Sequence, residues 1–239
     1  MKKVIILASA LRMKEKVILS SCLMLITVVS IAQGNSVRFG LRSGIYYSRF
    51  NFSNLPSEYR KPDGDETFYA GVQIDIPVSK KISIVPEVLY AISRVSSYID
   101  GLGIYDDNLS HILIPVSFKY KIGKLGLSAG PQAEVLLSAK GYYRSSTLQY
   151  DPISNVYYAT LEHGDIKNDS YRKLGFSGVL GAEYVFKYRF GIDARYQFGL
   201  TDFRASNGST LMTQYGKIQM HAFQAGLFFR FGKKPPKNG

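Results

Sequence analysis

The chain has 239 residues, of which 20% are charged and 13% aromatic, with no tryptophan and a formal net charge of +12. Beyond the N-terminal stretch it has no apolar run of the ~18 residues that a membrane-spanning helix needs, which excludes a multi-span helical membrane protein. The basic residues lie singly rather than in a patch, which argues against nucleic acid as a partner, and the single cysteine, Cys22, excludes a disulfide framework.

The N-terminal segment predicts a cleaved signal peptide over residues 1–32. A basic start at Met13 is followed by an apolar core at 17–31, and the small residues around Ala32 fit a cleavage site there. A weaker version of the same pattern precedes Met13, which we therefore treat as an alternative start of the chain. The residues that end at Cys22 resemble a lipidation motif, but the apolar run continues beyond them, which favours cleavage at Ala32.

Eight segments of the remaining chain alternate between apolar and polar residues, which predicts strands with two different faces. In the seventh segment, for example, Ile192 and Tyr196 fall on one face, whereas Asp193 and Arg195 fall on the other. Each segment has about the length that a tilted strand needs to cross a bilayer. In chain order the segments are 37–47, 68–78, 82–93, 111–122, 125–137, 174–186, 190–200 and 218–231.

The connections between these segments alternate in length, as they do in outer-membrane barrels. Tight turns are expected at 79–81, 123–124 and 187–189. Long loops are expected at 52–67, 94–110, 138–173 and 204–217. We therefore predict an all-β fold in which about eight antiparallel strands form a single closed transmembrane β-barrel, with short periplasmic turns and long extracellular loops. This domain occupies residues 33–239 and ends in a short basic tail at 233–239.

The polar faces of the segments predict a network of paired charges inside the barrel. A soluble ligand-binding barrel of the lipocalin type is the alternative, and it would place the apolar face inside instead. The polar faces carry five basic and five acidic residues among many glycines, which suits a narrow lumen where buried charges must be paired. The candidate lumen network consists of Arg38, Arg42, Asp75, Glu87, Lys119, Glu134, Glu183, Asp193, Arg195 and Arg230.

Four motifs together resemble the PorT-like outer-membrane β-barrel proteins of the Bacteroidota. They are FGLRSGIYYSRF, ISIVPEVLYAISR, HILIPVSFKYKIGKLGLSAGPQAEVLLSAK and GFSGVLGAEYVFKYRFGIDARYQFGLTDF. The resemblance implies an outer-membrane location. The name-giving member of that family is associated with type IX protein secretion, so the resemblance also implies an accessory role in secretion. One departure is that Phe231, the expected terminal aromatic residue, is followed by a basic tail.

We expect a non-enzymatic structural or interaction protein, monomeric in outer-membrane lipid, that contacts secretion-machinery or surface proteins through its long loops. The 138–173 loop holds Tyr142, Tyr143, Tyr150, Tyr157 and Tyr158, which either form a recognition surface or extend the neighbouring strands above the membrane. A small passive channel through the polar lumen is an alternative function. An outer-membrane lipid hydrolase is another.

The sequence offers no set of residues for a catalytic, cofactor-binding or metal site. His111 and His221 fall near the ends of predicted strands and His163 falls in the longest loop. No nucleophile elbow, H-E-x-x-H motif or phosphate-binding loop is present. The acidic residues of the 94–110 loop do not have the spacing of an EF-hand. We therefore expect no catalytic residues, no cofactor and no metal ion.

Overall fold

The computed structural model describes residues 37–52, 63–99, 103–151, 156–166, 171–187, 189–203 and 217–231. The predicted signal peptide, with its cleavage site at Ala32, and the basic tail at 233–239 lie outside these residues. Within the described residues, no helix has the length and apolar character needed to cross a membrane.

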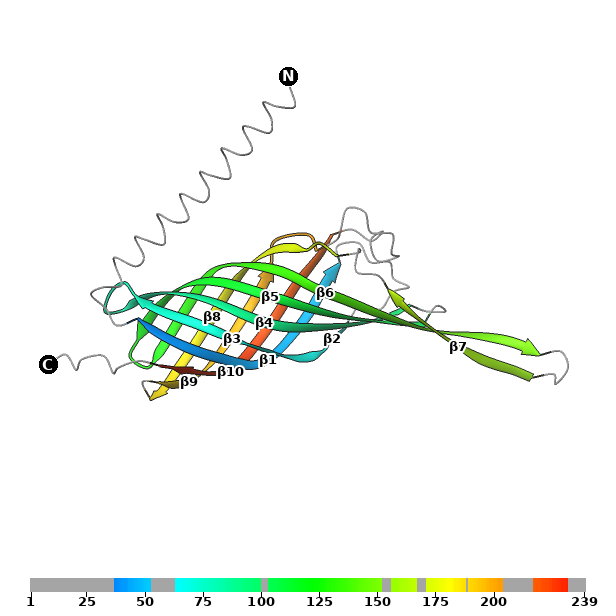
Figure 1. Cartoon of the computed structure of the whole chain (residues 1–239), viewed down its shortest axis with the longest axis horizontal. Coiled ribbons are helices and arrows are strands. Elements are labelled where there is room, and N and C mark those ends of the chain that lie inside the picture. Colours follow the sequence, from blue (N-terminus) through cyan, green and yellow to red (C-terminus); the bar gives the residue numbers. More distant parts are fainter. Residues whose placement is uncertain are drawn as a thin grey trace, which may run out of the picture.

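Eight antiparallel strands form a closed barrel (Figure 1), which confirms the predicted fold. They are β1 (Arg38–Phe52), β3 (Glu66–Pro77), β4 (Ile82–Ile99), β5 (Gly103–Ile122), β6 (Leu125–Asp151), β8 (Leu174–Lys187), β9 (Phe190–Gly199) and β10 (Ile218–Arg230). Around the barrel their order is β4, β3, β1, β10, β9, β8, β6 and β5, and pairing of β5 with β4 closes the ring. Closure leaves the barrel without an edge, as lipid requires, because lipid offers no partner to an unpaired backbone group.

Short turns join barrel strands at one end, at residues 78–81 and 123–124, and only two residues separate the end of β8 from the start of β9. In the first turn, the amides of Val78 and Ser79 both donate to the carbonyl of Ile82, at 2.9 and 3.0 Å. The second turn has only two residues and contains Gly123, whose φ of 60° lies in the left-handed region that glycine adopts most easily. In outer-membrane barrels the end with short turns faces the periplasm, and we refer to it below as the periplasmic end.

Two of the predicted long loops are wrong in extent, because most of their residues form paired strands. β4 and β5 continue through the predicted 94–110 loop until Ile99 pairs with Gly103. β6 continues to Asp151 through the predicted 138–173 loop, where it pairs with β7 (Val156–Ile166). Alternation of apolar and polar residues marks only the part of a strand that faces lipid, and backbone pairing continues beyond it.

The predicted 52–67 loop contains a two-residue strand, β2 (Asp63–Gly64), which pairs with β4. The predicted 204–217 loop lies almost wholly outside the described residues.

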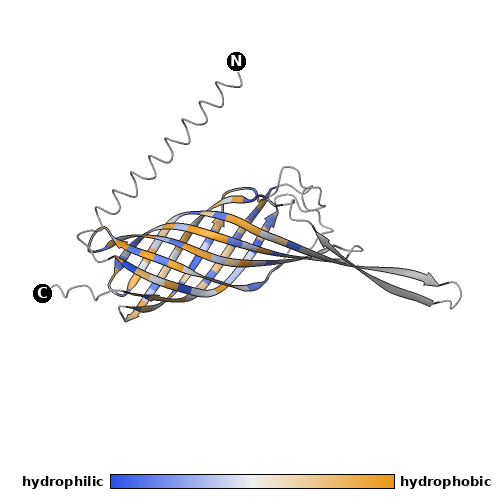
Figure 2. Cartoon of the chain, viewed as in Figure 1, coloured by the Kyte–Doolittle hydropathy of each residue, from blue (hydrophilic) through white to orange (hydrophobic). Residues whose placement is uncertain are grey.

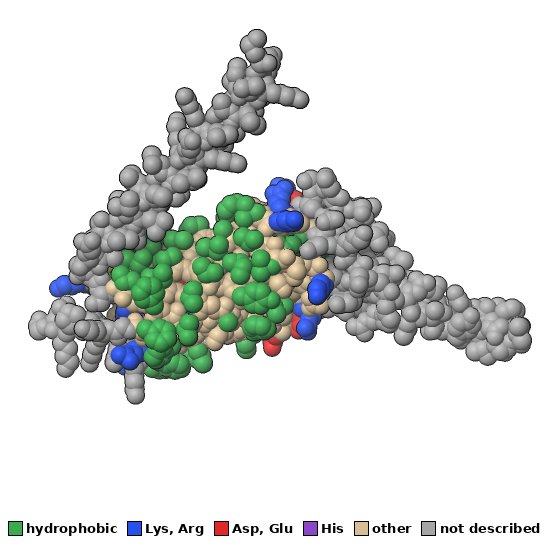
Figure 3. Space-filling model, in the orientation of Figure 1, with side chains coloured by type: hydrophobic (Ala, Val, Ile, Leu, Met, Phe, Trp, Pro, Cys, Tyr) green, Lys and Arg blue, Asp and Glu red, His purple; other side chains and the backbone are tan. Residues whose placement is uncertain are grey.

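The apolar face of the barrel points outward, as an outer-membrane barrel requires and as a soluble lipocalin-like barrel would not allow. Phe39, Phe118 and Leu180 are more than half exposed. Alternate residues along the strands differ in hydropathy (Figure 2), and apolar side chains are spread over the face of the barrel seen in Figure 3. The apolar surface therefore lies where lipid tails contact the protein.

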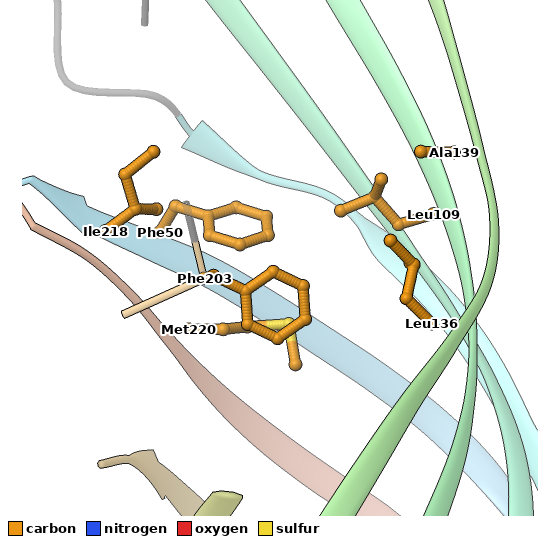
Figure 4. Packing of buried hydrophobic residues seen from close by; sticks show 7 residues of the cluster. All are labelled: Phe50, Leu109, Leu136, Ala139, Phe203, Ile218 and Met220. Carbon is orange, nitrogen blue, oxygen red and sulfur yellow. The ribbon is translucent and has the colours of Figure 1, made fainter. Parts of the chain in front are cut away.

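The inward-facing side chains change in character along the barrel axis. At the end opposite the short turns they form an apolar cluster (Figure 4) that consists of Phe50, Leu109, Leu136, Ala139, Phe203, Ile218 and Met220. His111 lies beside this cluster, fully buried, with its ring 5.7 Å from that of Phe203. Its predicted position near a strand end is wrong, because β5 begins eight residues earlier than expected. Toward the periplasmic end the inward side chains are polar and charged.

Candidate functional site

The candidate site is the charged lumen, which is built from the alternate positions that face inward on each strand. The predicted ten residues all point into the barrel, and Arg42, Glu87 and Lys119 are each only 2% exposed. Strand alternation places them there, because every second residue of a barrel strand faces the interior. The ten residues divide into a middle layer, a periplasmic layer and one separate carboxylate.

The middle layer is centred on an ion pair between Glu87 and Arg195. Arg195 donates to both carboxylate oxygens, with Nη1 at 2.8 Å from Oε2 and Nη2 at 2.7 Å from Oε1. Glu87 belongs to β4 and Arg195 to β9, which are four strands apart in the eight-strand ring. This bidentate pair therefore connects opposite walls of the barrel and crosses the lumen.

Arg42 and Asp193 complete the middle layer. Arg42 Nη1 lies 3.4 Å from Glu87 Oε1 and 3.5 Å from Asp193 Oδ2, and the hydroxyl of Tyr69 donates to Asp193 at 3.5 Å. The layer thus holds two arginines and two carboxylates, and its charges balance. Buried charges that are paired and hydrogen-bonded in this way avoid the large cost of isolated ones.

The periplasmic layer is centred on two carboxylates, Asp75 and Glu183. Asp75 Oδ2 accepts from Arg38 Nη2 at 2.6 Å and from Lys119 Nζ at 2.9 Å. Lys119 Nζ also lies 3.1 Å from Glu183, whose other oxygen accepts from Arg230. Each carboxylate is therefore shared between several cations.

Glu134 is the one member of the predicted set that forms no ion pair with a described residue. Its Oε1 instead accepts hydrogen bonds from the amides of Gln197 at 2.8 Å and Gln132 at 3.4 Å. Gln197 in turn accepts from the hydroxyl of Tyr46 at 3.2 Å. Glu134 thus belongs to a hydrogen-bond network with uncharged partners next to the charged layers.

The prediction missed two residues, Lys121 and Phe228, that contact members of the lumen network. Lys121 lies 3.7 Å from Asp75. The ring of Phe228 lies between two arginines, 4.2 Å from the guanidinium of Arg230 and 5.7 Å from that of Arg42, at distances typical of cation–π contacts. Both side chains lie at inward-facing positions of their strands, Lys121 two residues after Lys119 and Phe228 two residues before Arg230, so strand parity could have identified them.

The arrangement fills the lumen and brings together no catalytic or metal-binding group among the residues that the structure describes. The three histidines lie on β5, β7 and β10, and His221 is hydrogen-bonded to Tyr196 on the outer face. No group of three or more potential metal ligands occurs in the described part of the chain. Chemically, the lumen holds a set of fixed charges, most of them paired, whose side chains are buried in the middle of the barrel.

A family model for the outer membrane protein beta-barrel domain matches residues 31–205. The chain belongs to the outer membrane protein beta-barrel domain family. The protein is accordingly located in the outer membrane, which its closed eight-strand barrel crosses several times. No curated protein sequence matches the chain.

Solved structures similar to this chain include three outer-membrane proteins. The attachment invasion locus protein Ail of Yersinia pestis is 13% identical, with 82% of this chain and 100% of Ail covered and a TM-score of 0.47. The Neisserial surface protein NspA is 11% identical, with 81% and 97% covered and a TM-score of 0.46. The outer membrane protease OmpT of Escherichia coli is 10% identical, with 83% and 98% covered and a TM-score of 0.38.

Proposed function

We propose that this protein is a non-enzymatic, sealed barrel that anchors an extended β-hairpin outside the outer membrane, where the hairpin binds a partner protein. The observation that carries the proposal is the length of β6, which has 27 residues. Such a strand is about 90 Å long, whereas a tilted strand crosses a bilayer with roughly ten residues. Much of β6 therefore lies beyond the membrane.

The pairing of β6 shows where it leaves the barrel. Leu125 to Val135 pair with β8 in the barrel wall, and Gly141 to Asp151 pair with β7 instead. β5 follows the same strand outward as far as the pair between Ile104 and Arg144. Figure 1 shows the β6–β7 hairpin projecting from the end opposite the short turns. An extension with several paired strands can hold its shape outside the barrel.

The sealed lumen favours an anchor over a passive channel. The Glu87–Arg195 pair crosses the middle of the barrel, and the charged side chains there are buried rather than lining a water-filled path. Eight strands enclose an interior that side chains just fill. For the same reason the lumen provides no space in which a lipid substrate meets a catalytic group, which favours a non-enzymatic role over that of a hydrolase.

We further propose that the partner belongs to a secretion or surface-protein machine. The resemblance to PorT-like proteins supports this, because the name-giving member of that family is associated with type IX secretion. Five of the six tyrosines in the predicted 138–173 loop lie in the projecting hairpin, Tyr142, Tyr143 and Tyr150 on β6 and Tyr157 and Tyr158 on β7. Tyrosine-rich surfaces are common at protein interfaces.

Removal of the hairpin tests this proposal directly. Because Gly141 pairs with Ile166, residues 142–165 can be replaced by an Asn-Gly turn that joins the two strands at an existing pair. We expect the shortened protein to fold as a barrel, as shown by faster gel migration without boiling, and to remain in the outer membrane. In the source organism, we expect a defined set of surface or secreted proteins to be lost, as in a complete deletion of the gene.

A second shortened variant is the matched control. Ser97 pairs with Tyr105, so residues 98–104 can be removed from the β4–β5 extension and replaced by the same turn. We expect this variant to keep the surface and secreted proteins at the level of the unaltered strain. The proposal is contradicted if the complete deletion changes the set of surface and secreted proteins but removal of the β6–β7 hairpin alone does not.

A further inference from the structure

A pocket of about 250 Å³ lies at the periplasmic end of the barrel. Four basic side chains line it, and Glu183 is the only acidic side chain among its lining residues. Three of the four lie on the ends of barrel strands, and the fourth belongs to the two-residue turn between β5 and β6. The basic lining residues are Arg38, Lys121, Lys124 and Arg230.

The positive charge at this pocket exceeds the negative charge that is available to balance it. Asp75 and Glu183 are the two carboxylates of the periplasmic layer, and they are shared among Arg38, Lys119, Lys121 and Arg230. Lys124 adds a fifth cation and forms no ion pair with a described residue. By contrast, the middle layer of the same lumen has equal numbers of arginines and carboxylates. The periplasmic excess is therefore not a requirement of lumen packing.

The physical consequence is an attractive potential for anions. A concave site with an excess of one sign of charge, surrounded by low-dielectric walls, concentrates its field toward the opening. Lys121 sits at that opening with about a quarter of its side chain exposed, 3.7 Å from the nearest oxygen of Asp75. At this distance it retains donors for a further acceptor.

The pocket also includes apolar residues that face the lipid. Leu125 and Phe186 line it and are 38% and 47% exposed on the outer face of the barrel. The Phe186 ring packs between those of Tyr184, 5.3 Å away, and Phe190, 6.0 Å away. Aromatic groups of this kind mark the membrane interface in outer-membrane barrels, which places the pocket at the level of the inner-leaflet headgroups.

We propose that this pocket binds the phosphate group of a phospholipid from the inner leaflet of the outer membrane. The phosphate contacts Lys121 and Lys124, and the acyl chains lie over Leu125 and Phe186. The basic pocket supplies the charge complementarity and the adjoining apolar surface supplies the lipid contact, so the two features together favour a lipid phosphate over a soluble anion.

The test is a binding titration of the folded full-length protein in non-ionic detergent. Three probes are compared by isothermal titration calorimetry: dihexanoyl phosphatidylglycerol below its critical micelle concentration, dihexanoyl glycerol, which lacks phosphate, and inorganic phosphate. We expect the phosphatidylglycerol to bind more tightly than either of the others. Inorganic phosphate that binds as tightly as the phospholipid would identify a soluble anion as the ligand and overturn the lipid assignment.

Lysine variants locate the binding site. We expect Lys124→Gln and Lys121→Gln each to weaken phosphatidylglycerol binding about fivefold, the loss typical for one basic residue near an anionic lipid surface. Lys81→Gln is the matched control, because it removes the same charge from another turn at the same end and Lys81 is not among the residues that line the pocket. Lys124 lies in an exposed turn, so its variant stays informative even if Lys121→Gln disturbs folding. Equal losses for Lys124→Gln and Lys81→Gln, or no binding of phosphatidylglycerol at all, would overturn the proposal.

Discussion

Replacement of Glu87 by leucine is expected to lower the free energy of unfolding by about 3–5 kcal/mol, the usual cost of removing one partner from a buried ion pair. The carboxylate of Glu87 is the main acceptor for Arg195 and lies 3.4 Å from Arg42. Without it, Asp193 is the carboxylate that lies near both arginines, at 3.6 and 3.5 Å, and Arg42 has in addition Glu183 at 3.8 Å. The measurement is a urea titration of the refolded protein in phospholipid vesicles, followed by the shift in gel migration between unboiled and boiled samples.

Two further variants separate the loss of the ion pair from a general loss of packing. The double variant Glu87→Leu with Arg195→Met removes both charges of the pair, and it is expected to recover most of the lost stability because no additional unpaired cation remains. Asp65→Asn interrupts an exposed pair with Arg94, at 3.0 Å, and is expected to cost less than about 1 kcal/mol. A single variant Glu87→Leu as stable as Asp65→Asn would show that the lumen pair contributes little.

Replacement of Gly44 by valine is expected to cost about 3 kcal/mol or more, at or beyond the upper end of the usual range for overpacking. Gly44 pairs with Gly226 where β1 meets β10 and the first and last strands close the barrel. A Cβ atom at Gly44 would lie 2.1 Å from the carbonyl oxygen of Ala225 and 2.5 Å from Cα of Gly226. These are backbone atoms, so no side-chain rotation relieves the overlap. We expect a low yield of the fast-migrating folded form in refolding experiments.

Ser43→Val is the matched control for this glycine. Ser43 is the neighbouring residue on the same strand and its side chain faces outward, so the same new side chain meets lipid rather than backbone. We expect this variant to refold with a yield equal to that of the unaltered protein. If the two valine variants refold equally well, the close approach of β1 and β10 at Gly44 is not required for closure.

The barrel strands followed from the sequence because alternation is a local property that lipid contact imposes on each strand. The seventh segment was predicted at 190–200, and β9 runs from Phe190 to Gly199. Extension of the neighbouring strands above the membrane was one of two expectations for the 138–173 loop, and β6 does extend to Asp151. Its pairing there with a separate strand, β7, was not predicted, because beyond the membrane both faces of a strand meet water and the alternation ends. Strand pairing there depends on backbone hydrogen bonds, which leave no pattern in the side chains.

The predicted lumen set illustrates the same division between local and non-local information. Parity along each strand placed all ten side chains in the lumen. It did not indicate that Glu87 pairs with Arg195, 108 residues later, because that depends on which strands face each other across the ring. It also did not separate Glu134, whose partners are glutamines, from the carboxylates that form ion pairs. Register and closure determine these contacts, and neither is a property of a single segment.

Conductance in planar lipid bilayers tests the central claim, that the barrel is sealed by its own side chains, most directly. The unaltered protein, shown to be folded by its gel migration, is inserted into the bilayer and current is recorded at a series of voltages. Because the Glu87–Arg195 pair crosses the lumen and the surrounding charges are buried, we predict a current no greater than that of the protein-free bilayer. Stable, stepwise open currents from the folded protein would contradict the account and would make it a channel.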